Sequence, residues 1–350
     1  MDVNKAVSFL ENSFLKDLLK DDKVTDISYN GQDIFYVHND KGRLKSDIAI
    51  NKQEAKDFIR QIANLSEKQF SYQNPELDIS FGRYRFNALH QSICRKNNEE
   101  STCFAIRIAS STLKFNEDSS LDGLVKELLQ ILIDSNVSIV IGGQTGSGKT
   151  ELQKYLLSLM RDYTRTIVID NILELDQFKA SSNLDLNIWQ SDEKRESASI
   201  QNLVKNALRS NPDWLLVAES RGKEMLDVLN SSLTGHPIIT TIHAFDIKSM
   251  PNRMVRMVLM NEQKMSFIDV YSDISYHLRF YIYLKRKYTH NGLVQRYISS
   301  IAYLNNKKMK EIYGSDGKEH WFAKLPKEAI KLLDLSSASI RFLDIFKGGH

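Results

Sequence analysis

The sequence predicts an α/β protein in which a smaller α+β domain precedes a parallel sheet with helices on both faces. From residue 121 onward, short apolar runs alternate with amphipathic helical runs, which is the pattern of strand–helix–strand units. Residues 1–108 instead read as helical stretches among short strands with turn residues between them. Residues 109–120 are polar and show no periodicity, so we expect a linker there, followed by a second domain over residues 121–350.

The composition is that of an ordinary globular protein. The chain has 350 residues, of which 42% are hydrophobic and 26% charged, and its formal net charge of +3 is too small to indicate nucleic-acid binding. No run of about 18 apolar residues occurs, so we expect any membrane attachment to be peripheral or through a partner. The two cysteines, Cys94 and Cys103, lack the spacing of a zinc site and indicate a reducing, cytoplasmic environment.

The periodicity of apolar residues predicts the individual elements. In the first domain, helices are expected over residues 4–20 and 51–68, with Asn51 as an N-cap, and strands over residues 24–31, 33–40, 42–50, 79–93 and 102–109. In the second, helices are expected over residues 121–134, 151–161, 199–210, 222–233, 326–334 and 338–346. Its strands are expected over residues 138–143, 164–170, 214–220 and 238–244, with antiparallel strands 277–288 and 295–305 closing the sheet.

One stretch, SIVIGGQTGSGKTE at residues 138–151, predicts a phosphate-binding loop. Its spacing is G-x-x-x-x-G-K-[ST], between an apolar strand and a helical run. Glycines let the backbone curl so that several N–H groups face one hollow, and the N-terminus of the following helix adds partial positive charge. We expect Lys149 to reach the β- and γ-phosphates of a nucleotide and Thr150 to hold Mg²⁺. The expected nucleotide-binding residues are Gly143, Gln144, Thr145, Gly146, Ser147, Gly148, Lys149, Thr150 and Glu151.

Polar side chains follow three further strands, at the edge where a parallel sheet binds ligands. Glu219 ends an apolar run that we expect to neighbour the strand before the loop, and its carboxylate would hold Mg²⁺ through water or polarise the attacking water of ATP hydrolysis. Glu174 would orient water or the metal, or it is an ordinary loop carboxylate. His243 would sense the γ-phosphate or bridge subunits, or it is a structural histidine.

Four motifs in this order resemble the secretion or traffic ATPases of type II and type IV secretion, conjugation and type IV or Tad pili. GGQTGSGKT resembles their Walker A motif, IDNILEL their Asp box, NPDWLLVAESRG their Walker B motif and TGHPIITTIHA their His box. In the first domain, VTDISYNGQDIFYVHNDKGRL, LDISFGRYRFNAL and FAIRIAS are similar to further family segments. The resemblance runs from about residue 5 to about residue 305 and is closest to the type IV secretion and Tad-pilus branch.

The resemblance implies a hexameric ring in which the N-terminal domain is stacked on a RecA-like P-loop NTPase domain, with ATP between them. It implies that Thr150 and Glu219 serve the metal, and that Glu219 positions or activates water. Arg85 and Arg107 fall where arginines of the N-terminal domain approach the phosphates, from the same or the adjacent subunit. The residues to which the resemblance gives a catalytic role are Glu219, Glu174, His243, Arg85, Arg107, Arg209 and Arg221.

The sequence departs from the family pattern at the Asp box and the Walker B motif. Asp170 and Asn171 stand where the family usually has Glu and Asp, and Ala218 replaces the usual glycine before the catalytic glutamate. Because Asn171 removes a negative charge, we expect weaker metal affinity or slower turnover. Glu174 and Glu219 are retained, so the expected protein is still an enzyme.

The leading hypothesis is an Mg²⁺-dependent ATPase that works as a ring motor for type IV secretion, conjugative transfer or pilus assembly. It would be cytoplasmic, peripheral at the inner face of the cell membrane, with secretion or pilus machinery proteins as partners. Two alternatives remain open: a nucleotide-switched assembly scaffold with little turnover, and a DNA-translocating ATPase. The basic segments 284–288 and 305–310 lack interleaved aromatic residues, so direct nucleic-acid binding is not expected, and we interpret the methionines of residues 254–260 as core or subunit interface.

Overall fold

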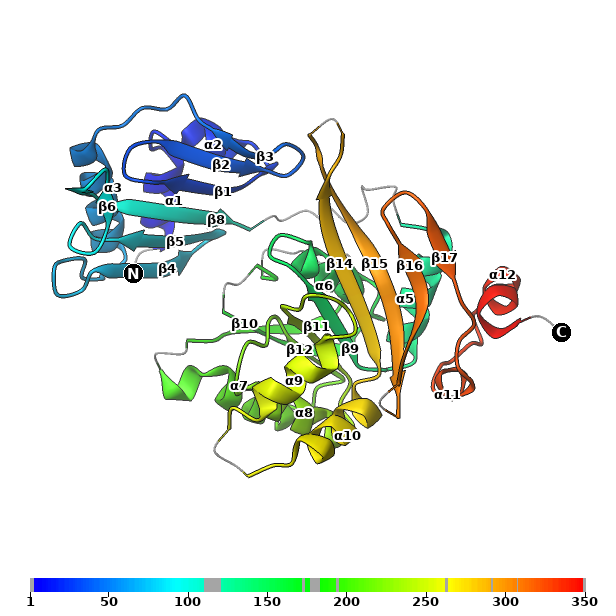
Figure 1. Cartoon of the computed structure of the whole chain (residues 1–350). Helices are drawn as coiled ribbons and strands as arrows, with labels where there is room; N and C mark the ends of the chain where they lie inside the picture. Colours follow the sequence, from blue (N-terminus) through cyan, green and yellow to red (C-terminus); the bar gives the residue numbers. More distant parts are fainter. Residues whose placement is uncertain are drawn as a thin grey trace. The chain divides into compact units, whose positions relative to one another are not determined.

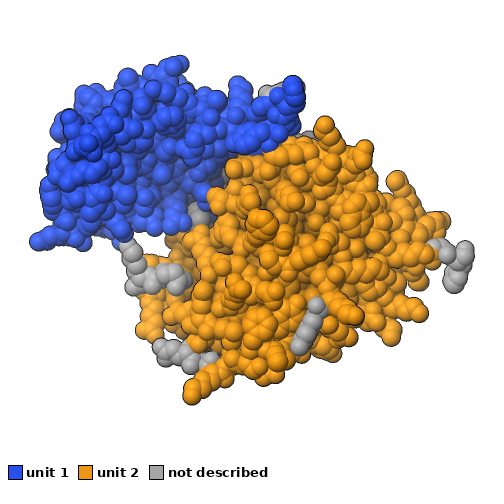
Figure 2. Space-filling view, in the orientation of Figure 1, with its two compact units in different colours: residues 1–111, 172–177, 288–294 blue, residues 112–171, 178–287, 295–350 orange. Residues whose placement is uncertain are grey.

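The structure is a computed structural model, and it describes residues 3–109, 121–171, 174–176, 183–192, 195–261, 264–290, 292–306 and 308–348. The chain divides into two compact units, which Figure 2 distinguishes by colour. Unit 1 comprises residues 1–111, 172–177 and 288–294, and unit 2 comprises residues 112–171, 178–287 and 295–350. Most of the expected linker, residues 110–120, lies outside the described residues. The domain boundaries expected from the sequence therefore stay a prediction.

Unit 1 is built on a six-stranded antiparallel sheet with the strand order β3-β2-β1-β8-β5-β4 (Figure 1). Its strands are β1 (Val24–Tyr29), β2 (Ile34–His38), β3 (Gly42–Lys45), β4 (Glu76–Phe81), β5 (Tyr84–Leu89) and β8 (Cys103–Ile108). β6 (Arg95–Lys96) and β7 (Glu99–Glu100) form a separate small ladder. The helices are α1 (Val3–Glu11), α2 (Lys16–Lys20) and α3 (Lys52–Leu65).

One apolar core lies between this sheet and the helices. Phe58 of α3 is 5% exposed, and its ring centroid lies 5.4 Å from that of Phe104 and 6.0 Å from that of Phe86. The helix begins as predicted, because the Asn51 side chain accepts from the Glu54 N–H at 2.9 Å while the Glu54 carboxylate accepts from the Asn51 N–H at 2.8 Å. This capping box satisfies two N–H groups that would otherwise lack partners.

Two expectations for unit 1 are wrong. Residues 4–20 do not form one helix, because the side chains of Asn12 and Ser13 bond back to the carbonyls of the preceding turn and the chain restarts as α2. Residues 79–93 do not form one strand, because the chain turns at Gly82, whose φ of +52° suits glycine, and makes the β4–β5 hairpin. Strand β5 pairs with β8 in antiparallel orientation.

Unit 2 contains a nine-stranded sheet with the order β11-β10-β12-β13-β9-β14-β15-β16-β17. Its strands are β9 (Ile139–Gly143), β10 (Arg165–Asp170), β11 (Asp185–Gln190), β12 (Trp214–Val217), β13 (Ile238–Ile242), β14 (Phe280–Tyr288), β15 (Val294–Asn305), β16 (Lys308–Ser315) and β17 (His320–Phe322). The strands from β11 to β14 in this order are parallel, and the pairs β15–β16 and β16–β17 are antiparallel. The central strands are buried throughout, as strands covered on both faces must be.

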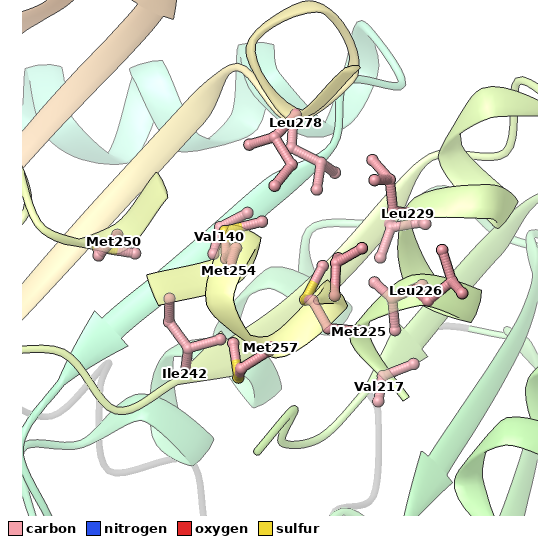
Figure 3. Packing of buried hydrophobic residues seen from close by; sticks show 14 of the residues in the cluster. Val140, Val217, Met225, Leu226, Leu229, Ile242, Met250, Met254, Met257 and Leu278 are labelled. Atoms are coloured by element: carbon pink, nitrogen blue, oxygen red, sulfur yellow. The ribbon is translucent and has the colours of Figure 1, made fainter. Parts of the chain in front are cut away.

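Helices cover both faces of this sheet (Figure 1). They are α5 (Gly123–Asp134), α6 (Lys149–Ser158), α7 (Ile200–Leu208), α8 (Met225–Leu233), α9 (Met250–Val258) and α10 (Phe267–His277), with a 3₁₀ turn at Glu196–Ala198. Beyond β17 follow α11 (Lys327–Ile330), α12 (Ile340–Phe342) and a π-helical turn at Leu343–Gly348. Helices α7 to α10 share one core with the sheet, part of which Figure 3 shows. Met254 and Met257 of α9 are fully buried in it, which confirms the interpretation as core for these two methionines, whereas Met260 just beyond the helix is exposed.

One expectation for unit 2 is wrong as well. The strand that leads to Glu219, β12, does not neighbour the loop strand β9, because β13 lies between them. The antiparallel strands expected at residues 277–288 and 295–305 are confirmed, since β14 and β15 are neighbours, the Thr289 N–H donates to the Leu293 carbonyl at 2.7 Å and the Leu304 N–H donates to the Arg279 carbonyl at 2.8 Å. On its other edge, β14 runs parallel to β9. The elements β11, β16, β17, α9 and α10 were not expected, and β11 is half-exposed without the alternation that identifies a strand.

Within the described ranges, no helix is both long enough and apolar enough to cross a bilayer. Both cysteines are free thiols.

Replacing Phe58 with alanine tests the core of unit 1. We expect the change to destabilise this unit by about 3–5 kcal/mol, because it removes a ring packed against four other rings and leaves a cavity. Urea unfolding followed by circular dichroism measures the loss. The exposed Ile93, replaced by alanine as a control, should change stability by less than about 0.5 kcal/mol. Equal unfolding midpoints for the two variants would contradict this account of the core.

Candidate functional site

A glycine-rich loop, residues 143–148, joins the end of β9 to the start of α6 (Figure 1). Gly146 has a φ of +73°, and Gly148, the N-cap of α6, has a φ of +98°. Side chains other than glycine rarely adopt these angles, which explains why the loop is glycine-rich. The loop thereby delivers the chain to a helix N-terminus whose first N–H groups have no partner within the helix.

The loop is packed tightly on itself and fits an anion. Ser147 is 1% exposed, and a Cβ built on Gly143 would lie 2.4 Å from its Oγ. This Oγ is buried and has no hydrogen-bond partner among the described residues. A buried hydroxyl without a partner, in a glycine-lined turn at a helix N-terminus, is suited to a phosphate oxygen.

Lys149, the first residue of α6, folds back over the loop. Its Nζ donates to the carbonyl oxygens of Gly143 at 3.1 Å and Gln144 at 3.3 Å, and lies 3.5 Å from Nδ1 of His243. His243 follows β13, the strand directly beside β9. An anion at the loop would compete with these carbonyls for the three N–H donors of the ammonium group.

Glu219 follows β12 and reaches the same edge of the sheet. Its side chain is 17% exposed, Arg221 Nη2 donates to its Oε2 at 2.7 Å, and His243 Nε2 lies 2.9 Å from its Oε1. The contact between His243 Nε2 and Glu219 Oε1 is short enough for an ion pair, but its angles are not those of a hydrogen bond. Oε1 is therefore buried and accepts no hydrogen bond from the part of the chain that the structure describes. Such an oxygen can orient a water molecule or accept its proton.

The surroundings of Glu219 hold it ionised. Burial raises the pKa of Glu219, but the hydrogen bond from Arg221 and the charges of Arg221 and Lys149 outweigh it, so the pKa lies below the ordinary value of 4.5. His243 lowers the pKa of Glu219 further only when the imidazole is itself protonated. Burial and repulsion by Lys149 lower the pKa of His243 below 6.5, although Glu219 opposes them. At neutral pH the pair is a carboxylate beside a neutral imidazole.

Buried polar side chains that the sequence reasoning missed fix the backbone before Glu219. The carbonyl of Ala218 accepts from Gln153 Nε2 at 3.2 Å and from Thr241 Oγ1 at 2.7 Å. The Ser220 hydroxyl lies 2.9 Å from that of Thr240. Gln153 is fully buried on α6, so it ties the helix after the loop to the strand end that carries Glu219. A polar residue inside the apolar run of this helix was the signal that could have revealed it.

Two arginines that the sequence reasoning also missed lie against the loop. Arg296 of β15 donates from Nε to the carbonyl of Gly146 at 2.9 Å. Arg286 of β14 lies so close that a Cβ built on Gly146 would be 2.9 Å from its Nη1. They reach the loop because β14 is the neighbour of β9 and β15 is the next strand after β14, an order that no sequence motif indicates.

The predicted residues of unit 1 form a polar ladder on the face of its sheet opposite the core. Arg85 and Arg107 are directly opposite each other on β5 and β8. Arg85 makes a bidentate pair with Asp78 at 3.1 and 3.0 Å. Arg107 lies 3.4 Å from Asp26 and 3.7 Å from Glu174. Within unit 1, Glu174, the glutamate of the Asp box, therefore lies beside Arg107, one of the two predicted arginines.

Other predicted residues occupy the edges of the loop site or lie away from it. Glu151 accepts from Lys154 Nζ at 2.9 Å, and Lys154 is buried. Asp170 is buried at the end of β10, followed by the half-buried Asn171. Arg209 caps the C-terminus of α7, which lies at the amino ends of the strands. Glu219 lies at their carboxyl ends, so the two residues of one chain are at opposite edges of the sheet. Catalytic roles for these residues stay predictions.

A hollow of about 470 Å³ lies at the amino ends of β9, β10, β12 and β13. Asn136, Thr164, Asp213 and His236 are among the residues that line it. It is at the opposite edge of the sheet from Lys149 and Glu219, so we assign it no part in their chemistry.

Comparison with known proteins gives one family. Residues 93–276, more than half of the chain, match the family model described as type II/IV secretion system protein. The chain is 28% identical over 275 residues to an uncharacterised protein of Bacillus anthracis, covering 77% of this chain and 60% of that protein. It is 34% identical over 128 residues to the type IV secretion system protein VirB11 of Brucella suis, covering 36% of each. The chain thus spans less than two thirds of the length of these relatives.

A solved structure gives the same fold. The ATPase DotB of Legionella pneumophila superposes with a TM-score of 0.61 at 19% identity, over 84% of this chain and 80% of that chain. At this identity the likeness establishes the fold alone: a RecA-like domain preceded by a smaller N-terminal domain.

The lowered pKa of His243 predicts a pH dependence of stability. Because the folded protein binds this proton less tightly than the unfolded chain, the contribution of neutral His243 is present above pH 6.5 and is lost as the pH falls toward the folded-state pKa. A His243→Gln variant cannot titrate and should lose less stability over that range. Thermal midpoints of both proteins between pH 5 and 7.5 measure the difference. Parallel curves would contradict the shift.

Proposed function

Because the chain belongs to the type II/IV secretion system protein family, we propose that it is an ATP-hydrolysing ring motor that powers type IV secretion, conjugative transfer or pilus assembly. It acts at the cytoplasmic face of the membrane as a homo-hexamer that docks on membrane-embedded secretion or pilus proteins. The names of relatives support the secretion context, since VirB11 is a type IV secretion system protein.

The observation that carries the ATPase proposal is the carboxylate of Glu219. It is ionised, and its Oε1 is buried without a hydrogen bond from the described residues. It is linked through His243 to Lys149, the residue that follows the glycine-rich loop. A merely structural carboxylate of this kind would have both oxygens satisfied. This one has an oxygen available for a water molecule next to the place where a phosphate chain fits.

In phosphoryl transfer, Lys149 binds the phosphate oxygens and Glu219 activates the attacking water. Bound ATP with Mg²⁺ supplies the transferable phosphoryl group and a metal that neutralises its charge. Lys149 leaves the carbonyls of Gly143 and Gln144 for the phosphate oxygens. Oε1 of Glu219 orients the attacking water and accepts its proton. Neutral His243, in contact with both Lys149 and Glu219, links the presence of phosphate to the position of the carboxylate.

The metal would be held mostly by groups other than carboxylates. Among the described residues, no group of three or more His, Cys, Asp or Glu side chains is arranged to hold a metal. Mg²⁺ commonly keeps several waters and binds through one or two protein oxygens together with phosphate. The Thr150 hydroxyl and, through water, Glu219 fit this arrangement.

The arginines of unit 1 supply charge to the transition state. Arg85 and Arg107 share one polar face, and Arg107 is paired with the Asp-box Glu174. A planar guanidinium matches the spread charge of a phosphoryl group. In the ring, these arginines act on the nucleotide of their own or the adjacent subunit, so each site is complete only after assembly.

A nucleotide-switched scaffold with little turnover is the second candidate. The observation that favours it is Asn171, uncharged directly after the buried Asp170 at the end of β10. Nucleotide binding would then order the ring, and hydrolysis would be incidental.

The steady-state ATPase rate per subunit, measured against protein concentration with Mg²⁺, tests the proposal. We expect the rate to rise steeply with concentration, because neighbouring subunits complete the sites, and to fall to background in Glu219→Gln. The exposed Glu328, changed to Gln as a control, should leave the rate unchanged. A low rate that is flat with concentration and equal in all three proteins would favour the scaffold.

Changing Gln153 to leucine tests how the carboxylate is positioned. Leucine fills the buried position but cannot donate to the Ala218 carbonyl, and one such hydrogen bond corresponds to about tenfold in rate. We therefore expect kcat to fall about tenfold while the affinity for ADP and the thermal midpoint stay the same. An unchanged kcat would show that Thr241 alone fixes this carbonyl.

A further inference from the structure

Strands β14 and β15 continue past the end of β9 and carry basic side chains to the level of the glycine-rich loop. In the parallel pairing of β14 with β9, Leu284 is opposite Gly143, the last residue of β9. The chain of β9 then turns into the loop, while β14 continues through Arg286 to Tyr288. Because side chains alternate along a strand, Arg286 lies on the opposite face from its neighbours Lys285 and Lys287.

The contacts distinguish the arginines of these strands from the lysines. Lys287 donates to the Asp316 carbonyl and lies over the Tyr297 ring, 5.2 Å from its centroid, on the side of β16 and β17. Arg286 and Arg296 instead meet the loop. A Cβ built on Gly146 would be 2.9 Å from Arg286 Nη1, and one built on Gly148 would be 3.7 Å from Arg296 Cδ.

Arg296 acts on the backbone of the loop. Its Nε donates to the carbonyl of Gly146, and the N–H of the same peptide unit, that of Ser147, bonds to the Gln144 carbonyl at 3.2 Å. Both ends of this peptide are therefore fixed. The Gly146 carbonyl oxygen, which would otherwise present its partial negative charge at the loop, accepts from the Arg296 guanidinium instead.

Arg286 lies at the loop surface. It is exposed, and its guanidinium is beside Gly146, whose lack of a side chain leaves that part of the loop open. A guanidinium offers paired donors that match phosphate oxygens, and it stays charged at any physiological pH. Its position adds a cation at the rim, on a different strand from Lys149.

We propose that Arg286 and Arg296 form a second cationic wall of the nucleotide site: Arg286 binds the phosphate chain of a nucleoside diphosphate or triphosphate directly, and Arg296 is a positioning residue for the Gly146 peptide. The inference rests on the proposed ATPase function and extends it to strands that carry none of the sequence motifs.

Equilibrium binding of mant-ADP, a fluorescent ADP, to the full-length chain tests the proposal without requiring turnover. We expect Arg286→Ala and Arg296→Ala each to weaken binding about tenfold. Arg296→Lys should recover part of the loss, because an ammonium can still donate to the Gly146 carbonyl. Lys285→Ala removes the same charge from the other face of β14 and should bind like wild type. The dependence of affinity on salt should be weaker for Arg286→Ala than for Lys285→Ala.

The kinetic constants separate direct binding from a general structural effect. Arg286→Ala should raise KM for ATP about tenfold with little change in kcat, and its thermal midpoint should match that of Lys285→Ala. Mant-ADP affinities equal in Arg286→Ala and Lys285→Ala would overturn the role of Arg286. Wild-type affinity in Arg296→Ala would overturn that of Arg296. If wild type itself failed to bind mant-ADP, and Lys149→Ala made no difference, the proposed function would fail rather than this extension of it.

Discussion

The ionised carboxylate of Glu219 is the group on which the site of unit 2 depends. Burial alone would raise the pKa of a carboxylate this little exposed, because it disfavours the charge. Arg221 supplies the hydrogen bond and Lys149 the additional charge that keep it ionised, and His243 is in contact with both Lys149 and Glu219. The three strand ends that carry Glu219, His243 and the loop are therefore coupled through one electrostatic cluster.

The topology explains why these groups meet. Parallel strands bring their carboxyl ends to one edge, and β13 between β9 and β12 places His243 between the loop lysine and the glutamate. Gln153 and Thr241 then fix the backbone before Glu219, while β14 and β15 bring two arginines to the other side of the loop. Adjacent strands and the loop helix therefore each contribute a group to the proposed phosphate site.

The sequence predicted what depends on local pattern. The loop, its strand and helix, the N-cap Asn51 and the buried methionines of α9 all follow from spacing or periodicity, and the structure has them. What it could not predict depends on strand order, which pattern does not encode: the separation of β12 from β9, the parallel pairing of β14 with β9, and the arrival of Arg286 and Arg296 at the loop. The helix break after α1 and the turn at Gly82 were missed because apolar periodicity continued through both.

The ionisation state of Glu219 is the most direct test of this account. Carbon-13 NMR of protein labelled at the glutamate carboxyl groups, compared with Glu219→Gln to identify the signal, follows it as the pH is lowered. The account predicts that the Glu219 carboxyl signal keeps the shift of an ionised group until the pH is below 4.5, the ordinary value for glutamate. A titration midpoint above that value would contradict it, because burial would then outweigh Arg221 and Lys149.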